Sequence, residues 1–192
     1  MKAVKRCAWT EGGDEAYLRY HDEEWGVPVH DDKKLFEFII LEGAQAGLSW
    51  RTILNRRNGY RRTFQDFDPR KVAQMTEKDV ERLMHDSSII RNRKKIASAI
   101  NNAKRFLEVQ KEFGSFSTYM WSWNDNQHAR DQRRKTQSEI PATTPLAIAM
   151  AKDLKKRGFT FLGPTIWYAH MQAVGMVNDH TTDCFRHCEI GK

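Results

Sequence analysis

Two pairs of cysteine and histidine residues near the ends of the sequence have spacings that suit metal binding. Thirteen residues separate Cys7 from His21. His180 and Cys184 are four positions apart in the sequence HTTDC, and they would share one face of a helix if that segment were helical. Two thiolates and two imidazoles form a closed tetrahedral zinc set, although buried cysteines with solvated histidines are the alternative interpretation.

Other residues could compete for the same metal ion. His187 and Cys188 follow closely in the sequence CFRHCEIGK. Neither pair forms the C-x-x-C pattern that would identify a zinc knuckle. The spacing alone therefore leaves open whether Cys184 or one of these two neighbours completes the set, and His30, His85, His128 and His170 are further available ligands.

A single glutamate in an apolar segment is the second feature that suggests chemistry. Glu42 lies at helical spacing from Leu35, Phe38 and Ile39, so its carboxylate is expected to enter an apolar environment. A buried carboxylate is costly unless it is paired or protonated, and one that faces aromatic rings suits a cationic ligand. The alternative is a structural role, in which Glu42 pairs with an arginine or caps backbone N–H groups.

Aromatic residues are concentrated in the first fifty positions of the chain. The tryptophans and tyrosines among them are Trp9, Tyr17, Tyr20, Trp25 and Trp50. Rings of this kind could form a cage in which a nucleobase stacks, or they could belong to an ordinary core.

A basic, glycine-containing turn is the third feature. In the sequence LKKRGFTFLGPTIWYAHM (154–171), Lys155 and Lys156 precede Gly158, and Gly163 precedes a helix that begins at a proline. Such a turn can offer backbone N–H groups and a helix N-terminus to a phosphate. A plain pair of antiparallel helices without a ligand is the alternative.

The elements that must position these residues are predicted to be helices. Caps are expected at Asp14, Asp31, Ser49, Asp68, Thr76 and Thr144, and helix ends at Gly47, Gly114 and Gly158. No convincing strand alternation is visible, and the polar stretch 124–141 is predicted to be a long exposed loop. The sequence therefore predicts an all-α fold of roughly eight to ten helices.

Composition limits the class of protein. The 192 residues are 40% apolar, which is enough for a core, and the net charge of +7 favours a polyanionic partner such as nucleic acid or an acidic membrane face. The densest apolar run, 35–41, is too short to span a bilayer, and no apolar block follows Met1. With three cysteines and no disulfide pattern, we expect a soluble, cytoplasmic protein that does not enter membranes.

Eight stretches of the sequence together resemble a known family. They are RCAWT, YHDEEWGVP, KKLFEFIILEGAQAGLSW, FDPRKVAQM, IIRNRKKIASAINNA, SEIPATT, LKKRGFTFLGPTI and GMVNDH. Between about Arg6 and Cys184 the chain resembles the 3-methyladenine DNA glycosylase I family, small bacterial alkylation-repair enzymes of the helix-hairpin-helix superfamily. The combination of YHDEEWGVP with LEGAQAGLSW carries most of this resemblance.

The resemblance implies a role for each residue introduced above. Cys7, His21, His180 and Cys184 would bind a structural Zn²⁺ that clips the chain ends together, with Cys188 outside the set. Glu42 would recognise the base, and Trp9, Tyr17, Tyr20 and Trp50, with Trp25 nearby, would form its pocket. Gln45, Gly47 and Leu48 would fill the gap that a flipped nucleotide leaves in the duplex, and the hairpin with Lys155, Lys156, Gly158 and Gly163 would bind DNA.

The implied activity is hydrolytic removal of 3-methyladenine from double-stranded alkylated DNA, which leaves an abasic site without a lyase step. Residues 1–192 would form one glycosylase unit, a monomer, with clipped terminal segments 1–30 and 165–192 and a helical core 31–164 that leads into the hairpin at about 154–171. Asp179, the nearest acidic residue after the hairpin, is interpreted as structural rather than catalytic. A zinc-stapled protein that binds damaged nucleic acid without cutting it is the alternative.

Overall fold

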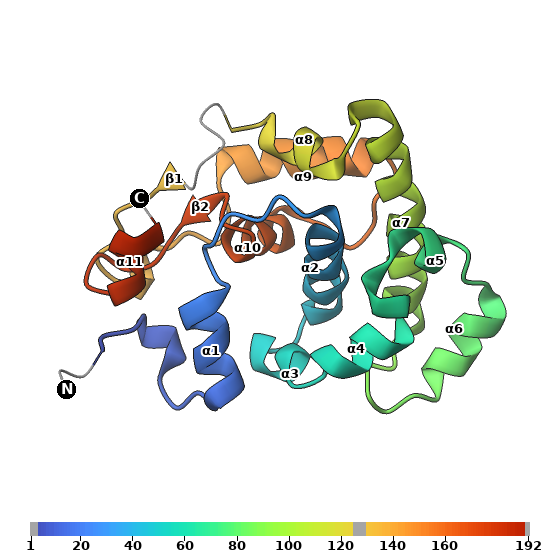
Figure 1. Ribbon diagram of the computed structural model, residues 1–192, viewed down its shortest axis with the longest axis horizontal. Coiled ribbons are helices and arrows are strands. Elements are labelled where there is room, and N and C mark those ends of the chain that lie inside the picture. Colours follow the sequence, from blue (N-terminus) through green and yellow to red (C-terminus); the bar gives the residue numbers. More distant parts are fainter. Residues whose placement is uncertain (1–3, 125–129, 191–192) are drawn as a thin grey trace.

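The computed structural model describes residues 4–124 and 130–190, and over these ranges the chain is mainly helical (Figure 1). The first helices are α1 (Glu15–Glu23), α2 (Asp32–Gln45), α3 (Trp50–Leu54), α4 (Arg57–Thr63), α5 (Pro69–Ala73) and α6 (Glu77–Met84). They are followed by α7 (Arg93–Phe113), α8 (Phe116–Trp121), α9 (Pro145–Lys156), α10 (Pro164–Ala173) and α11 (Phe185–Ile190). Short 3₁₀ turns span Ala8–Thr10, Gln65–Phe67 and Gln137–Glu139. The predicted all-α class is confirmed.

The helix caps explain why these elements begin where they do. The side chains of Asp14 and Asp31 accept hydrogen bonds from the backbone N–H groups of Tyr17 and Lys34, as the sequence predicted. Ser49, Asp68 and Thr144 cap α3, α5 and α9 in the same way. Thr76 and Asp79 form the predicted capping box of α6.

Two regions differ from the sequence prediction. The segment after Ser49 forms two short helices, because Asn55 closes α3 and Arg56 leaves helical geometry at φ −105° and ψ 0°. This division brings the described α-helices to eleven, slightly more than the predicted eight to ten. The expected loop 124–141 contains a 3₁₀ turn and the strand β1 (Arg130–Asp131), which pairs in parallel with β2 (Val177–Asn178). Residues 125–129 of that loop lie outside the described ranges.

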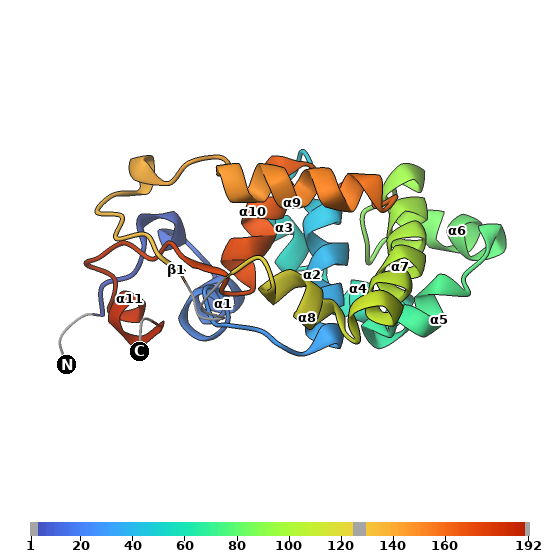
Figure 2. The same cartoon turned by 90° about the horizontal axis from the view of Figure 1, so that it is seen from above.

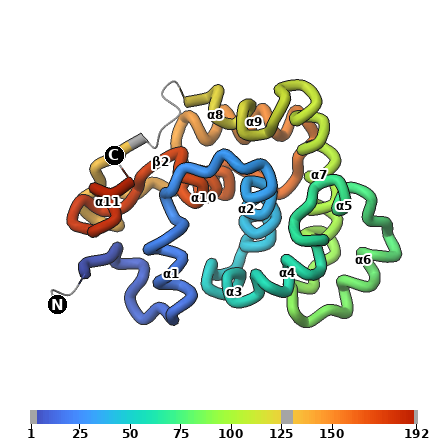
Figure 3. The backbone as a smooth tube through the Cα atoms, viewed as in Figure 1, coloured from blue at the N-terminus to red at the C-terminus, as the bar shows by residue number. Residues whose placement is uncertain are grey.

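The core is organised around α2, which lies between α7 and α10 (Figure 3). Every residue from Leu35 to Ala44 is buried, because α2 also packs against α3 and α8. Polar positions on such a helix are unusual, and Glu37 and Glu42 are both inside. Among residues 4–124 and 130–190, every helix is too short or too polar to span a bilayer.

The two ends of the chain lie at the same side of the molecule, as both views show (Figures 1 and 2). The N–H of Phe185, the first residue of α11, donates to the carbonyl of Lys5 at 2.9 Å. The N–H of Thr182 donates to the carbonyl of Arg134 at 2.8 Å. The fold thus brings the N-terminal segment, the loop before α9 and the C-terminal segment together beside α10.

Candidate functional site

The four predicted metal ligands converge between the chain ends. One ligand atom from each of Cys7, His21, His180 and Cys184 lies within 4.8 Å of the other three, and all four residues are buried. The Sγ of Cys184 is 3.5 Å from His21 Nε2 and 3.5 Å from His180 Nδ1. A tetrahedral zinc ion with its usual bond lengths separates sulfur and nitrogen ligands by about 3.6 Å. The cluster therefore has the dimensions of a closed tetrahedral metal centre.

The second nitrogen of each imidazole already has a hydrogen-bond acceptor. His21 Nδ1 lies 2.8 Å from Asp22 Oδ1, and His180 Nε2 lies 2.9 Å from the carbonyl oxygen of Trp25. These contacts leave Nε2 of His21 and Nδ1 of His180 free to face the cluster, the arrangement found around ligating histidines. Asp22 is itself held by the guanidinium of Arg6 at 2.7 Å.

The structure also distinguishes Cys184 from His187 and Cys188 as the candidate metal ligand. Contact with Cys7, and hydrogen bonds from His180 and His21, lower the pKa of the Cys184 thiol against the opposing effect of burial. Cys188 is exposed, and His187 Nε2 is 2.9 Å from Asp131 rather than in the cluster. The segment from His180 to Cys184 is a turn, not the helix considered from the sequence, and it still aims both side chains at one point.

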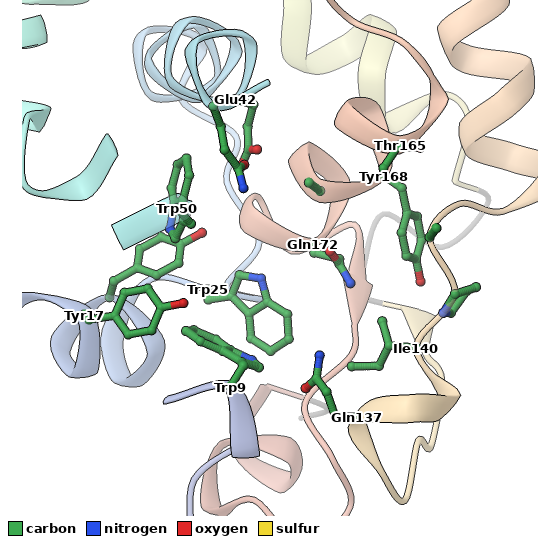
Figure 4. Close-up of a pocket in the computed structure, with 15 residues that line it drawn as sticks. Trp9, Tyr17, Trp25, Glu42, Trp50, Gln137, Ile140, Thr165, Tyr168 and Gln172 are labelled. Carbon is green, nitrogen blue, oxygen red and sulfur yellow. The ribbon is translucent and has the colours of Figure 1, made fainter. Parts of the chain in front are cut away.

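Next to this cluster, the described residues enclose a cavity of about 420 Å³ (Figure 4). All five predicted aromatic residues line it, together with Glu42 and Gln45. Trp9 stands edge-on to Tyr17 and to Trp25, with ring centres 5.1 Å apart in both pairs. Tyr20 packs against Trp50 at 5.4 Å. In Figure 4, Tyr17 and Trp50 stand at the left, Trp9 stands below them, and Trp25 lies near the centre of the view.

Glu42 brings a carboxyl group to this cavity without a protein partner. The residue is 3% exposed, and Oε2 is buried with no hydrogen bond among the described residues. Arg57, a partly buried cation, is engaged by Glu24 and Glu37 at 2.7 and 2.8 Å. Burial alone raises the pKa of Glu42 to about 8. The alternative of a structural ion pair at Glu42 therefore has no support in these contacts.

Polar indole atoms are also unpaired at the cavity. Trp9 Nε1 and Trp50 Nε1 are buried and have no hydrogen-bond partner among the described residues. A buried donor without a partner is costly, and such groups are satisfied when a ligand with acceptor atoms binds. The residues that line the cavity thus include two indole N–H donors and one carboxyl oxygen without a partner among the described residues.

The opposite wall of the cavity was not predicted. It is formed by Gln137, Ile140, Pro141, Ala142, Thr165, Tyr168, Ala169 and Gln172. Gln137, Ile140 and Pro141 belong to the stretch predicted as exposed loop, and Ala142 follows it directly. The other four lie on α10, which was predicted only as the second helix of a hairpin. The SEIPATT motif was the available signal for Ile140, Pro141 and Ala142, because it is part of the family resemblance.

Asp179 lies behind this wall and does not line the cavity. It is 1% exposed and accepts hydrogen bonds from the Tyr168 hydroxyl at 2.6 Å and from Gln172 Nε2 at 2.8 Å. Arg134 Nε lies 3.7 Å from its other oxygen. Asp179 therefore contacts the cavity only indirectly, by holding the side chains of Tyr168 and Gln172.

The residues predicted to contact DNA lie at the surface. Gly47 follows the end of α2 with φ +77°, and Leu48 is one of the exposed large apolar side chains, at 40% exposure. Lys95 supports this turn by donating to the carbonyl oxygens of Ala44 and Ala46 at 2.8 and 2.6 Å. At the hairpin, Lys155, Lys156, Gly158 and Gly163 are all exposed, and Gly158 adopts φ +88°.

The fold and the site together define a DNA glycosylase: an all-helical protein with an aromatic cavity and a carboxyl group that no protein cation neutralises. The chain belongs to the methyladenine glycosylase family, whose sequence model matches residues 9–187.

Comparisons with individual proteins agree with this assignment. The chain is 51% identical over 181 residues to DNA-3-methyladenine glycosylase 1 of Escherichia coli (strain K12), covering 94% of this chain and 96% of that protein. A crystal structure of 3-methyladenine DNA glycosylase I superposes with a TM-score of 0.91 at 49% identity, covering 94% of this chain and 98% of the other. A structure of the Staphylococcus aureus enzyme, described as the structural basis of 3-methyladenine recognition, has a TM-score of 0.90 at 40% identity, covering 95% and 96%.

Proposed function

We propose that this chain removes 3-methyladenine from alkylated double-stranded DNA by binding the flipped base in the cavity and admitting water to the sugar. The observation that carries this proposal is Glu42, a 3% exposed carboxyl group without a protein partner at an aromatic cavity. The whole chain is expected to act as one glycosylase unit and as a monomer.

The charge of the substrate explains why this cavity is selective. Methylation at N3 leaves the adenine base in DNA with a positive charge. Electron-rich ring faces and a carboxylate attract that cation more strongly than neutral adenine. A cationic base would also stabilise the ionised form of Glu42, whose pKa is raised to about 8 by burial. Recognition of the damaged base and stabilisation of the buried carboxylate are therefore the same interaction.

The reaction needs little further assistance, because alkylation has already made the base a good leaving group. Water attacks the sugar carbon, the bond to the base breaks with its electron pair leaving on the base, and one proton of the water is released to solvent. The products are free neutral 3-methyladenine and an abasic site. An amine nucleophile is not required for this step, so we propose a monofunctional enzyme without lyase activity.

The metal centre has a structural part in this proposal. Cys7, His21, His180 and Cys184 would hold Zn²⁺, which supplies a cross-link between the chain ends. His180 Nε2 is hydrogen-bonded to the carbonyl oxygen of Trp25, so the cross-link would also fix the cavity wall that contains Trp25. None of the four ligands is a cavity-lining residue, which supports a role outside the reaction.

Two surface features would engage the duplex. Leu48, with Gln45 and Gly47, would fill the gap left by the flipped nucleotide. The hairpin with Lys155, Lys156, Gly158 and Gly163 would bind the phosphate backbone through its lysines and its exposed helix N-terminus.

A glycosylase assay on methylated duplex DNA, with chromatographic analysis of the released bases, tests the proposal. We expect free 3-methyladenine and alkali-labile abasic sites, without strand cleavage before alkali. Tight binding to methylated DNA with no released base would instead support the alternative of a non-catalytic damage-binding protein.

A further inference from the structure

The carboxamide of Gln172 has one fixed orientation at the cavity wall. Its Nε2 lies 2.8 Å from Asp179 Oδ2, and this oxygen also accepts a hydrogen bond from the Tyr168 hydroxyl at 2.6 Å. A carboxylate only accepts hydrogen bonds, so the amide must turn its NH₂ group toward Asp179. The opposite orientation would place two oxygen atoms 2.8 Å apart and lose a charge-assisted hydrogen bond.

This orientation decides which polar atom Gln172 presents to a ligand. Gln172 lines the cavity, whereas Asp179 lies behind the wall at 1% exposure. The amide nitrogen is engaged on the buried side, so the carboxamide oxygen remains for the cavity and has no hydrogen-bond partner among the described residues. Figure 4 shows the Gln172 side chain between Trp25 and Tyr168, across from Tyr17 and Trp50.

A second acceptor comes from a different helix. Glu42 lies on α2 and Gln172 on α10, and these two helices pack against each other beside the cavity. A base whose edge carries an amino group can donate hydrogen bonds to such acceptors. A base with a carbonyl group in that place brings an oxygen that can only accept, and a site with unpaired acceptors rejects it.

From this arrangement we propose that Gln172 is a specificity-determining residue that selects amino-substituted over oxo-substituted bases, and that Asp179 is the positioning residue that sets its amide. This inference rests on the proposed function, because it assigns a role at the same cavity. Tyr168 contributes to this arrangement, because its hydroxyl donates a hydrogen bond to the same oxygen of Asp179 that accepts from the Gln172 amide.

The test compares two free bases of nearly the same shape, 3-methyladenine and its oxo counterpart 3-methylhypoxanthine. Their dissociation constants are measured by calorimetry for the wild-type protein and for Gln172→Leu, which keeps side-chain bulk but removes the acceptor. We expect the wild-type preference for 3-methyladenine to fall about fivefold to tenfold in the variant, the size of one hydrogen bond. Gln74→Leu, an exposed amide of another region, is the matched control.

Asp179→Asn separates positioning from a structural role. The new amide can donate to the Gln172 oxygen, which lets the Gln172 NH₂ group turn toward the cavity. The preference of Asp179→Asn for 3-methyladenine over 3-methylhypoxanthine should then be lower than that of the wild type. Zinc content and melting temperature are measured on the same sample. A merely structural Asp179 would weaken the binding of both bases equally and leave their ratio unchanged.

The outcomes distinguish this inference from the proposed function. An unchanged ratio in Gln172→Leu, with normal binding of 3-methyladenine by the wild type, overturns the role of Gln172 alone. A wild-type protein that binds neither base and releases none from methylated DNA overturns both proposals.

Discussion

His180 and Trp25 connect the metal centre to the base-binding cavity. His180 Nε2 lies 2.9 Å from the carbonyl oxygen of Trp25, and the two rings stand nearly perpendicular with centres 4.6 Å apart. The next residue, Gly26, adopts φ +83°, and its N–H donates to the carbonyl of Gln172 at 3.0 Å. A Cβ at Gly26 would lie 3.2 Å from the His180 ring. The wall formed by Trp25 is thus held between a candidate metal ligand and α10.

Metal removal should therefore affect both stability and the cavity. We expect elemental analysis to find about one zinc ion per chain, because the four donors fit tetrahedral coordination. Chelation of that ion should lower the melting temperature strongly and change the fluorescence of the cavity tryptophans. A folded, active preparation that contains no zinc would contradict the assignment.

The two C-terminal cysteines should respond differently to substitution. Cys184→Ser removes a buried donor 3.5 Å from both histidine nitrogens, so we expect loss of zinc or failure to fold. Cys188→Ser is the matched control, because Cys188 is exposed and lies outside the cluster. Zinc content after purification measures the difference, and the reverse pattern would move the ligand to Cys188.

The hairpin lysines should contribute to DNA binding in proportion to their charge. Replacing Lys155 and Lys156 by glutamine should weaken binding and reduce the slope of log K against log salt by about one for each phosphate that a lysine no longer neutralises. Lys78→Gln, an exposed lysine on α6, serves as the control. A slope equal to that of the wild type would exclude the two lysines from binding phosphate.

Leu48 should matter for duplex DNA and not for the free base. Leu48→Ala shortens the side chain expected to fill the gap in the duplex, so we expect excision to slow by about tenfold. This factor corresponds to about 1.4 kcal/mol, a fraction of the free energy needed to unstack a base. Affinity for free 3-methyladenine should stay the same. Ile148→Ala, an apolar side chain exposed at 47% on α9, is the control. Equal rates for both variants would refute a role of Leu48 in base flipping.

The sequence predicted well those features that depend on local patterns. An N-cap such as Asp14 or Asp31 interacts only with the backbone three positions further on, so it can be predicted from the local sequence. The structure confirms both of these helix starts. Glu42 was identified as buried because its apolar neighbours recur at helical spacing along a single helix. The metal cluster depended on the family resemblance, since the spacing left His187 and Cys188 as rivals.

Features that depend on the packing of distant segments were not predicted. Gln137 and Ile140 reach the cavity because the strand pair β1–β2 and the hydrogen bond between Arg134 and Thr182 lay this loop along the C-terminal segment. Tyr168 and Gln172 lie on a helix whose pattern shows only that it is largely buried. Their bonds to Asp179 become visible only when α10 and the segment after it are packed together.

The pH dependence of stability tests the environment of Glu42. Burial raises its pKa from 4.5 to about 8, so the folded protein holds a proton that the unfolded chain releases between these values. Stability should therefore fall as pH rises from about 4.5 to 8 and should not change further above 8 from this group. At pH 7 the shift corresponds to about 3 kcal/mol, which Glu42→Gln should recover. We expect the variant to melt at or above the wild-type temperature, with a gap that grows between pH 5 and pH 8.

Base affinity of the same variant completes the test. Glu42→Gln keeps the shape of the side chain but cannot ionise when the base binds, which should cost about 1–3 kcal/mol and weaken binding of free 3-methyladenine about tenfold to a hundredfold. A structural ion pair at Glu42 predicts the opposite pattern, because removing one partner of a buried pair costs about 3–5 kcal/mol of stability. Calorimetry of base binding and thermal melting on one preparation separate the two roles. A large loss of stability with unchanged affinity would show that Glu42 supports the fold and does not recognise the base.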